Sequence, residues 1–399
     1  MLFSIDTIHE DSNYRIKDKE KALVFHKLCI SNKNTRKMIT ENLGLRPITV
    51  SKIIKELIED GLVIEGDSKE RSSKGRPEMQ LAPNYCRFSA ISIYVVSKEI
   101  KGKLVNLNGE ILESQSVLIP KEVDNIAIIK ELQRILKFLV SKLPEKSQLI
   151  GIGTSLPGTV NGEKGKWTSS ARWPKLSNIS FTELISEFNV PLSLNRSLDP
   201  ELEYLLFNNE NFRKGGTLLF HWGYGIGSAF ASEGKVLKSS LGRFGEVGHW
   251  QVNHNSTKRC SCGSIGCLET EAALWAILPE IRKVYPAAPE DEPEFTRFIQ
   301  NNDIGNLEVI KKALGYVTMS LANLYKVFYP DRILLLGPFT KNSSIYTKLK
   351  SGLLAQIPEY AQPAVELNVV SGFQGAVSGS VYHLFRDALR PLLRTRTNV

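Results

Sequence analysis

The sequence predicts a mixed α/β protein with a small helical domain in front of a larger domain. Three short helices and a hairpin fill residues 18–85, strands alternate with helices over residues 86–399, and 399 residues exceed the usual size of one hydrophobic core. Hydrophobic residues make up 42% of the chain and charged residues 23%. This ordinary globular composition excludes wholesale disorder, a collagen-like repeat and a coiled-coil rod.

The first domain begins after residues 1–17, which are polar and aperiodic and are expected to form a loose leader. Apolar residues at helical spacing predict a helix over Lys19–Ile30, and a second helix fits Thr35–Leu43 with Gly44 as its stop. Pro47 suits the first turn of a third helix that ends before Gly61. Its predicted apolar stripe consists of Ile48, Ile53, Ile54, Leu57 and Ile58.

A hairpin with a long basic tip follows the third helix. Leu62–Glu65 and Glu78–Leu81 are expected to be its strands, and residues 66–77 its tip. Three helices and a hairpin in this order are typical of a winged helix-turn-helix. The alternative is a protein-interaction module whose basic loop is a solvated face.

In a winged helix the third helix lies in the DNA major groove. Short side chains would then reach base edges and lysines would reach phosphates, which identifies the candidate residues Thr49, Ser51, Lys52 and Lys55. In the hairpin tip, Lys74 and Arg76 are expected to enter an A·T-rich minor groove. A formal charge of +9 permits a polyanionic partner. A second basic group is interpreted as a solvated tail and not as a DNA contact: Arg386, Arg390, Arg394 and Arg396.

Regular alternation of strands and helices continues to the end of the chain. A helix is expected from Asp199, with Asp199 as its cap and Pro200 in its first position. The other predicted helices are 126–143 and 344–357. The predicted strands are 88–96, 103–107, 111–118, 149–155, 192–195, 217–221, 228–232, 332–336 and 365–370.

The five cysteines suit a metal site better than a disulfide framework, because their number is odd and three of them lie within eight positions. Those three are Cys260, Cys262 and Cys267, and His249 precedes them by eleven residues. Three thiols and one imidazole form a closed tetrahedral set for a structural Zn²⁺. The alternative is a surface loop with three reduced thiols, and Cys29 and Cys86 are interpreted as core residues.

Three motifs together resemble the ROK family of repressors, open reading frames and sugar kinases. They are Gly223–Gly227, Gly245–His249 and Cys260–Glu269. The resemblance runs from Phe88 to the C-terminus, and the winged helix extends it to the repressor branch typified by xylose and N-acetylglucosamine repressors. It implies a two-lobed, actin-like (ribonuclease H-like) fold, a hexose-type ligand between the lobes, structural zinc, and a homodimer or homotetramer.

The resemblance also assigns individual residues. It implies that His249, Cys260, Cys262 and Cys267 bind zinc, within a zinc loop at residues 245–269, and that Glu246, His249 and Glu269 contact the sugar. Carboxylates can accept hydrogen bonds from vicinal hydroxyls, and one imidazole can serve a metal and a hydroxyl through different nitrogens. The alternative is that Glu246 and Glu269 are surface charges.

The chain departs from the family's kinases at two motifs. The strand Phe88–Val95 has neither the acid nor the glycines of their phosphate loop. Their Asn-Asp pair is replaced by Asn195 and Arg196, or by Ser197 in another register, and arginine cannot accept a proton. We therefore expect Asn195 and Arg196 to serve ligand binding, with Arg196 favouring an anionic effector such as a sugar phosphate.

The glycines at Gly223–Gly227 could bind phosphate or form only a tight turn, and Leu336–Pro338 departs from the family's double glycine near the nucleotide. The sequence therefore predicts a sugar-responsive, DNA-binding transcriptional regulator, most simply a repressor of carbohydrate genes, rather than an enzyme. Its alternatives are an active ATP-dependent sugar kinase carrying a winged helix, a structural scaffold, and a regulator that responds to a protein partner.

The expected location is the cytoplasm. No apolar run approaches the length needed to span a bilayer, and the start of the chain lacks a basic region followed by an apolar stretch. No membrane partner is expected.

Overall fold

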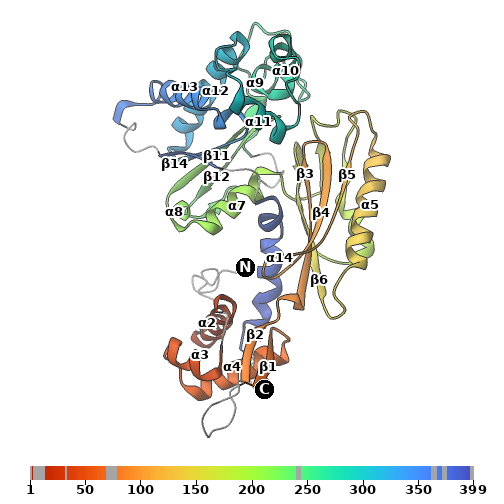
Figure 1. Cartoon of the computed structure of the whole chain (residues 1–399), viewed down its shortest axis with the longest axis vertical. Coiled ribbons are helices and arrows are strands. Elements are labelled where there is room, and N and C mark those ends of the chain that lie inside the picture. Colours follow the sequence, from red (N-terminus) through yellow and green to blue (C-terminus); the bar gives the residue numbers. More distant parts are fainter. Residues whose placement is uncertain are drawn as a thin grey trace.

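The computed structural model describes residues 2, 14–31, 34–68, 79–239, 244–360, 366–370 and 375–395. Figure 1 shows three parts: a small helical domain at the bottom, a first lobe built around one sheet, and a second lobe at the top. The long helix α14 (Gly375–Leu392) runs from the region between the lobes down to the small domain (Figure 1). The mixed α/β class predicted from the sequence is confirmed.

The small domain contains the three predicted helices, α2 (Ile16–Ile30), α3 (Arg36–Leu43) and α4 (Pro47–Glu59). Thr35 caps α3 by accepting a hydrogen bond from the backbone N–H of Met38. Gly44 ends the helix in the left-handed conformation, with φ of 63°. Pro47 occupies the first position of α4, where its missing N–H costs no hydrogen bond.

A two-stranded antiparallel sheet follows α4, formed by β1 (Val63–Ser68) and β2 (Met79–Pro83). The order of three helices and two paired strands is that of a winged helix-turn-helix. Lys74 and Arg76 lie outside the described residues, as does Arg396 in the second basic group.

One expectation for this region was wrong: Ile48 was placed in the apolar stripe of α4, but it is 85% exposed, and Val50 is buried there instead. The expected loose leader, residues 1–17, lies mostly outside the described residues. Within its described part, Leu2 and Tyr14 are buried in the core that the small domain shares with the first lobe. Apolar contacts with the folded core compensate for the conformational entropy lost at these two residues.

The first lobe is built on a five-stranded sheet in the order β10-β6-β3-β4-β5. Strand β3 pairs antiparallel with β4 and parallel with β6, which pairs parallel with β10, and β4 pairs antiparallel with β5. These strands span β3 (Phe88–Val96), β4 (Glu99–Asn106), β5 (Ile111–Leu118), β6 (Gln148–Ser155) and β10 (Leu192–Ser193). The helix α5 (Asn125–Ser141) connects β5 to β6 and packs on this sheet (Figure 1).

The second lobe repeats this topology. Its sheet has the order β13-β12-β11-β14-β15, in which β11 pairs antiparallel with β12 and parallel with β14, and β14 pairs parallel with β15. The strands are β11 (Gly216–Trp222), β12 (Ile226–Ser232), β13 (Lys235–Val236), β14 (Arg332–Leu336) and β15 (Glu366–Val369). Two sheets with the same order and directions make the two-lobed, actin-like arrangement.

The remaining elements complete the lobes. In the first lobe the sequence did not predict the small sheet of β7 (Thr159–Asn161), β8 (Lys166–Ser169) and β9 (Ile179–Ser180), nor the helix α6 (Phe181–Ile185). The main helices after β10 are α7 (Leu198–Asn208), α8 (Glu210–Arg213), α9 (Leu268–Ala272), α10 (Leu274–Val284), α11 (Glu292–Asn301), α12 (Glu308–Phe328) and α13 (Ser343–Leu354).

Helices α7 and α14 cross at very close range between the lobes. Gly375 and Gly379 on α14 face α7, and a Cβ at Gly379 would lie 2.0 Å from the carbonyl oxygen of Pro200. The N–H of Gly375 donates a 2.7 Å hydrogen bond to Glu201 on α7. The two glycines therefore set the distance between these helices.

The other end of α14 is joined to the small domain. Val381, Leu384, Phe385 and Leu389 belong to the same hydrophobic core as residues of α2 and α4. Just beyond the helix, the backbone N–H and hydroxyl of Thr395 each donate a 2.7 Å hydrogen bond to Asp18 on α2. One continuous core thus connects the first lobe, α14 and the winged helix.

A buried charged cluster strengthens this junction. The ammonium group of Lys21 is fully buried, 3.0 Å from Glu56 and 3.1 Å from Asp60, and it also donates to the carbonyl oxygen of Arg394. The guanidinium of Arg394 lies over the ring of Tyr14, at 5.3 Å. Arg394 thus contacts the domain junction through its carbonyl group and through Tyr14, while its side chain remains exposed. No helix within the described ranges is long and apolar enough to cross a membrane.

The crossing of α7 and α14 can be tested with one added methyl group. Gly379→Ala is expected to lower the free energy of unfolding by about 1–3 kcal/mol, because the new Cβ overlaps the Pro200 carbonyl. Gly315→Ala on α12 is the matched control, since a Cβ there meets no atom within 4 Å and should stabilise the helix by about 0.5–1 kcal/mol. Urea unfolding measures both, and equal stabilities would contradict the close crossing.

Candidate ligand cavity, metal centre and DNA-facing helix

A cavity of about 460 Å³ lies between the two lobes. The first lobe contributes the end of β3 and the segment after β8, and the second lobe contributes the ends of β11 and β14 and the start of α11. Both sheets therefore direct the ends of strands into this cavity. It is lined by four of the five predicted ligand residues, Arg196, Glu246, His249 and Glu269.

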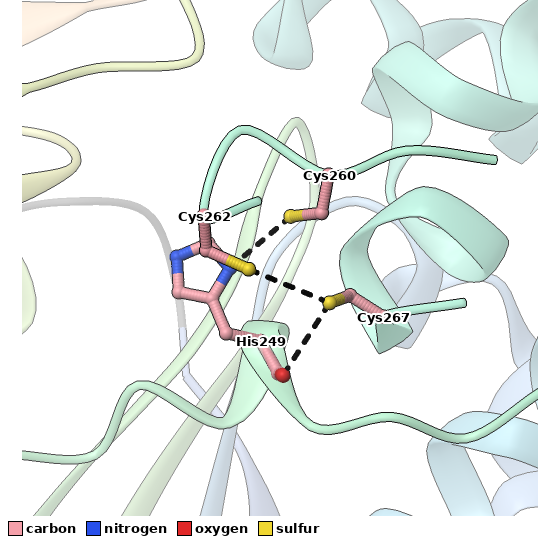
Figure 2. A group of neighbouring side chains, drawn as sticks. All are labelled: His249, Cys260, Cys262 and Cys267. Atoms are coloured by element: carbon pink, nitrogen blue, oxygen red, sulfur yellow. Dashed lines mark hydrogen bonds between the residues drawn. The ribbon is translucent and has the colours of Figure 1, made fainter. Parts of the chain in front are cut away.

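Beside the cavity, the four predicted metal ligands come together (Figure 2). One donor atom from each of His249, Cys260, Cys262 and Cys267 lies within 4.8 Å of every other. The Sγ atoms of Cys262 and Cys267 are 3.7 Å apart, and Nδ1 of His249 is 3.3 Å from Sγ of Cys260. Sequence reasoning thus identified the whole set.

The distances between the donor atoms fit a metal ion with tetrahedral coordination. Metal–sulfur bonds of about 2.3 Å place two thiolates on a tetrahedron roughly 3.8 Å apart. Gly266, with φ of 71°, makes the tight turn before Cys267, where a Cβ would lie 2.0 Å from the carbonyl oxygen of Asn253. One imidazole and three thiols are a donor set suited to a structural metal ion.

His249 connects this cluster to the cavity through its two ring nitrogens. Nδ1 faces the cysteines, whereas Nε2 lies 3.5 Å from Oε2 of Glu246. The hydrogen bond with Cys260 raises the pKa of His249 to about 9. Burial opposes ionisation of Cys260, but the hydrogen bond from His249 lowers its thiol pKa to about 7. By contrast, burial raises the pKa of Cys29 to about 12, as expected for a core thiol.

Glu246 and Glu269 supply carboxylates to the same part of the cavity. Oε1 of Glu269 accepts a 3.1 Å hydrogen bond from the indole N–H of Trp275, and burial raises the pKa of this carboxyl. Oε1 of Glu246 is buried and has no hydrogen-bond partner among the described residues. Such an atom favours a ligand that donates a hydroxyl hydrogen bond.

Arg196 is 6% exposed and lies across the junction of the lobes. Its guanidinium donates to Asp199 at 3.1 Å and to the carbonyl oxygen of Ser228 at 2.8 Å, and it lies 3.6 Å from Glu246. The prediction that Asp199 caps α7 was therefore wrong: Ser197 precedes the helix, and Asp199 binds Arg196 instead. Because two carboxylates already face it, Arg196 gives little support for an anionic effector.

Asn195 does not line the cavity. Its side-chain amide donates to the carbonyl and hydroxyl oxygens of Ser193, and its amide oxygen accepts from Lys238. The structure therefore separates Asn195 from the ligand residues with which the sequence grouped it.

Sequence reasoning missed a charged group that links the lobes. Arg172, from the first lobe, lies over the ring of Tyr224 at 4.6 Å and 3.9 Å from Glu292. Glu292 begins α11 and also lies 3.3 Å from Nε2 of His221. Arg172, Tyr224 and Glu292 are far apart in the sequence and share no motif, so no sequence signal could have predicted this group.

The glycine turn between β11 and β12 is bound by a side chain of the protein itself. The backbone N–H of Tyr224, which an anion could use, donates a 2.5 Å hydrogen bond to Glu292. Although burial raises it, the electrostatic interaction and hydrogen bond with His221, the positive charge of Arg172 and the hydrogen bond from Tyr224 lower the pKa of Glu292 to about 2. The turn thus holds an ionised carboxylate of the chain itself.

On the opposite end of the molecule, α4 presents the predicted DNA-facing residues. Ser51, Lys52 and Lys55 are exposed, and Thr49 is half-buried. Lys55 lies 3.9 Å from Glu59. The exposed Ile48 lies one helical turn before Ser51 and Lys52, so this face combines hydroxyl, ammonium and apolar groups.

Residues 90–381 match the description "ROK family". The chain belongs to the ROK family. Among curated relatives, it is 26% identical over 340 residues to the xylose repressor of Caldicellulosiruptor bescii, covering 80% of this chain and 83% of that protein. It is also 26% identical over 342 residues to the N-acetylglucosamine repressor of Escherichia coli O157:H7, covering 83% of each.

Solved structures of ROK proteins share the fold. A ROK family transcriptional regulator, described as a homologue of the Escherichia coli MLC protein, superposes with a TM-score of 0.69 at 24% identity, covering 95% of this chain and 98% of that one. A ROK hexokinase from Thermus thermophilus gives a TM-score of 0.58 at 20% identity, covering 75% of this chain and 99% of that one. The fold alone therefore accommodates both repressors and kinases, and the site must distinguish them.

Proposed function

We propose that the protein is a cytoplasmic transcriptional repressor whose affinity for operator DNA is set by a saccharide bound between its lobes. The observation that carries this proposal is the combination of an exposed face on α4 with a cavity in which the buried Oε1 of Glu246 lies 3.6 Å from Arg196 but has no hydrogen-bond partner among the described residues. The named relatives regulate genes and carry names of sugars, which supports the same conclusion.

The DNA contacts follow from the geometry of α4. Ser51 and Thr49 would contact base edges, Lys52 and Lys55 would contact phosphates, and Ile48 would contact a thymine methyl group. Lys74 and Arg76 keep their proposed place in the minor groove. As a homodimer or homotetramer, the protein would present paired winged helices to a pseudo-palindromic operator.

The saccharide contacts follow from the polar groups in the cavity. Glu246 and Glu269 would accept hydrogen bonds from ring hydroxyls, Nε2–H of His249 would donate one, and Arg196 would hold Glu246 in place. Asn195 does not take part in this proposal.

The cavity suits binding better than phosphoryl transfer. Arg196, at the position expected for a catalytic base, cannot accept a proton. Glu292 is a carboxylate in the cavity, but a pKa of about 2 makes it a weak base, and its oxygens already bind Tyr224 and His221. The alternative function is an ATP-dependent sugar kinase.

Helix α14 connects the region of the cavity with the small domain that contains the proposed DNA-facing helix α4. It packs on α7, which starts two residues after Arg196, and it ends in the core of the winged helix. If saccharide binding changes the angle between the lobes, α14 must move with one of them. The ligand's influence on DNA binding then equals its difference in affinity for the two arrangements.

We propose zinc as the ion of the Cys₃His cluster, in a structural role that orients Nε2 of His249 toward the cavity. Purified protein is expected to hold about one Zn²⁺ per chain by mass spectrometry. Cys260→Ser should lose the metal, whereas Cys86→Ser, at a half-buried thiol outside the cluster, should retain it. Retention of metal by both variants would contradict the assignment.

Loss of two lysines on α4 should weaken DNA binding. Lys52→Ala combined with Lys55→Ala is expected to lower the slope of log K against log salt by about 2 and to reduce affinity about tenfold or more at moderate salt. Fluorescence anisotropy with DNA from the promoter beside the gene measures this. Lys311→Ala with Lys312→Ala, an exposed pair on α12, is the matched control and should bind normally.

Equal DNA affinity of these two double variants would refute the proposed interface. An ADP-release assay over a panel of sugars tests the rival function. Robust ATP turnover by the purified protein would support a kinase and contradict the proposed repressor.

A further inference from the structure

The cavity has two chemically different halves, which the turn between β11 and β12 separates. Gly225 is the neighbour of Glu269, whereas the adjacent Tyr224 binds Glu292 through its N–H. The half on the side of Glu269 contains Glu246 and His249. The other half lies beside Glu292 and His221 and extends to Gly337, whose position adjoins His221.

Apolar side chains form much of the wall of the second half. Val95 and Val96 line the cavity from the end of β3 in the first lobe. From the second lobe, Pro293 follows Glu292, and Leu336 and Pro338 flank Gly337. Such surfaces bind the apolar faces of rings. The hydroxyl of Ser97 is buried here and has no hydrogen-bond partner within the described part of the chain. This half thus suits a ring that is apolar on its faces and carries a hydroxyl.

The charged groups of the second half already have partners within the protein. Glu292 accepts the Tyr224 N–H that a phosphate would need, and it lies 3.9 Å from Arg172, which also lines the cavity. The strongly lowered pKa of Glu292 keeps it ionised near neutral pH, so its negative charge offsets the positive charge of Arg172. Lys341 adds a cation at this end of the cavity, so the half carries charges of both signs, and the backbone N–H of Tyr224 is already used.

The size of the cavity also exceeds that of one sugar ring. At about 460 Å³ it lies in the range of pockets that enclose a drug-sized ligand, which is larger than one hexose. A monosaccharide held by Glu246, His249 and Glu269 would leave the second half to water against apolar walls. Releasing that water into bulk is favourable when an apolar ring replaces it.

We propose that the second half is a subsite for a neutral ring linked glycosidically to the first, so that the effector is a disaccharide or another glycoside and not a free or phosphorylated monosaccharide. This proposal rests on the proposed function, since it names the ligand class of the same cavity. Val96 and Pro293, one from each lobe, would determine the preference for the larger ligand.

Calorimetric titrations of the full-length protein test the subsite. The probes are xylose, glucose and N-acetylglucosamine, their β-1,4-linked disaccharides, N-acetylglucosamine 6-phosphate and ATP. At least one disaccharide is expected to bind about tenfold tighter than its monosaccharide. Val96→Trp should fill the subsite and remove this difference while leaving monosaccharide affinity unchanged within about twofold. Val369→Trp, at a strand position outside the cavity, is the matched control and should behave like the wild type.

Pro293→Trp, at an exposed position in the first turn of α11, gives a second blocking variant in case Val96→Trp fails to fold. The subsite is refuted if monosaccharides bind as tightly as disaccharides, if blocking variants bind disaccharides normally, or if the phosphorylated sugar or ATP binds tightest. Monosaccharide binding without a disaccharide preference overturns the subsite alone. Failure of every saccharide to bind overturns the proposed function as well.

Discussion

The close crossing of α7 and α14 is the contact on which the rest of this molecule depends. Gly379 allows α14 to lie against the Pro200 carbonyl, and Gly375 donates to Glu201, so α14 is held beside the start of α7 and thus beside the cavity. The same helix extends beyond the lobes, and its last turns belong to the core of the small domain. A single helix therefore connects the cavity with the small domain that carries the proposed DNA-binding face.

Polar contacts at each end of this element give it a defined position. Asp18 binds Thr395, and the buried Lys21 binds Glu56, Asp60 and the Arg394 carbonyl, which fixes the winged helix to the end of the chain. At the other end, Arg196 connects α7 to Ser228 and Glu246 in the second lobe. Groups buried with their partners in this way are costly to separate, which favours discrete arrangements over gradual bending.

Local signals explain what the sequence could predict. Thr35, Gly44 and Pro47 act within a turn of their own positions, so the helices of the small domain could be placed closely. The metal cluster has its ligands in a short loop plus one histidine. Long-range packing explains the failures. Ile48 has the right spacing for the core but faces outward, and Asp199 has the right position for a cap but is taken by Arg196. Arg172, Tyr224 and Glu292 meet only because the lobes fold together.

The most direct test of the coupling between the cavity and DNA binding is the affinity for labelled promoter DNA. It is measured with and without a saturating saccharide, after calorimetry has verified that this saccharide binds. The account predicts at least about a fivefold change for the wild type. It predicts a clearly smaller change for Asp18→Ala, which removes the contacts with Thr395 but should leave saccharide affinity intact. A wild type whose DNA affinity is the same with the cavity filled or empty would contradict it.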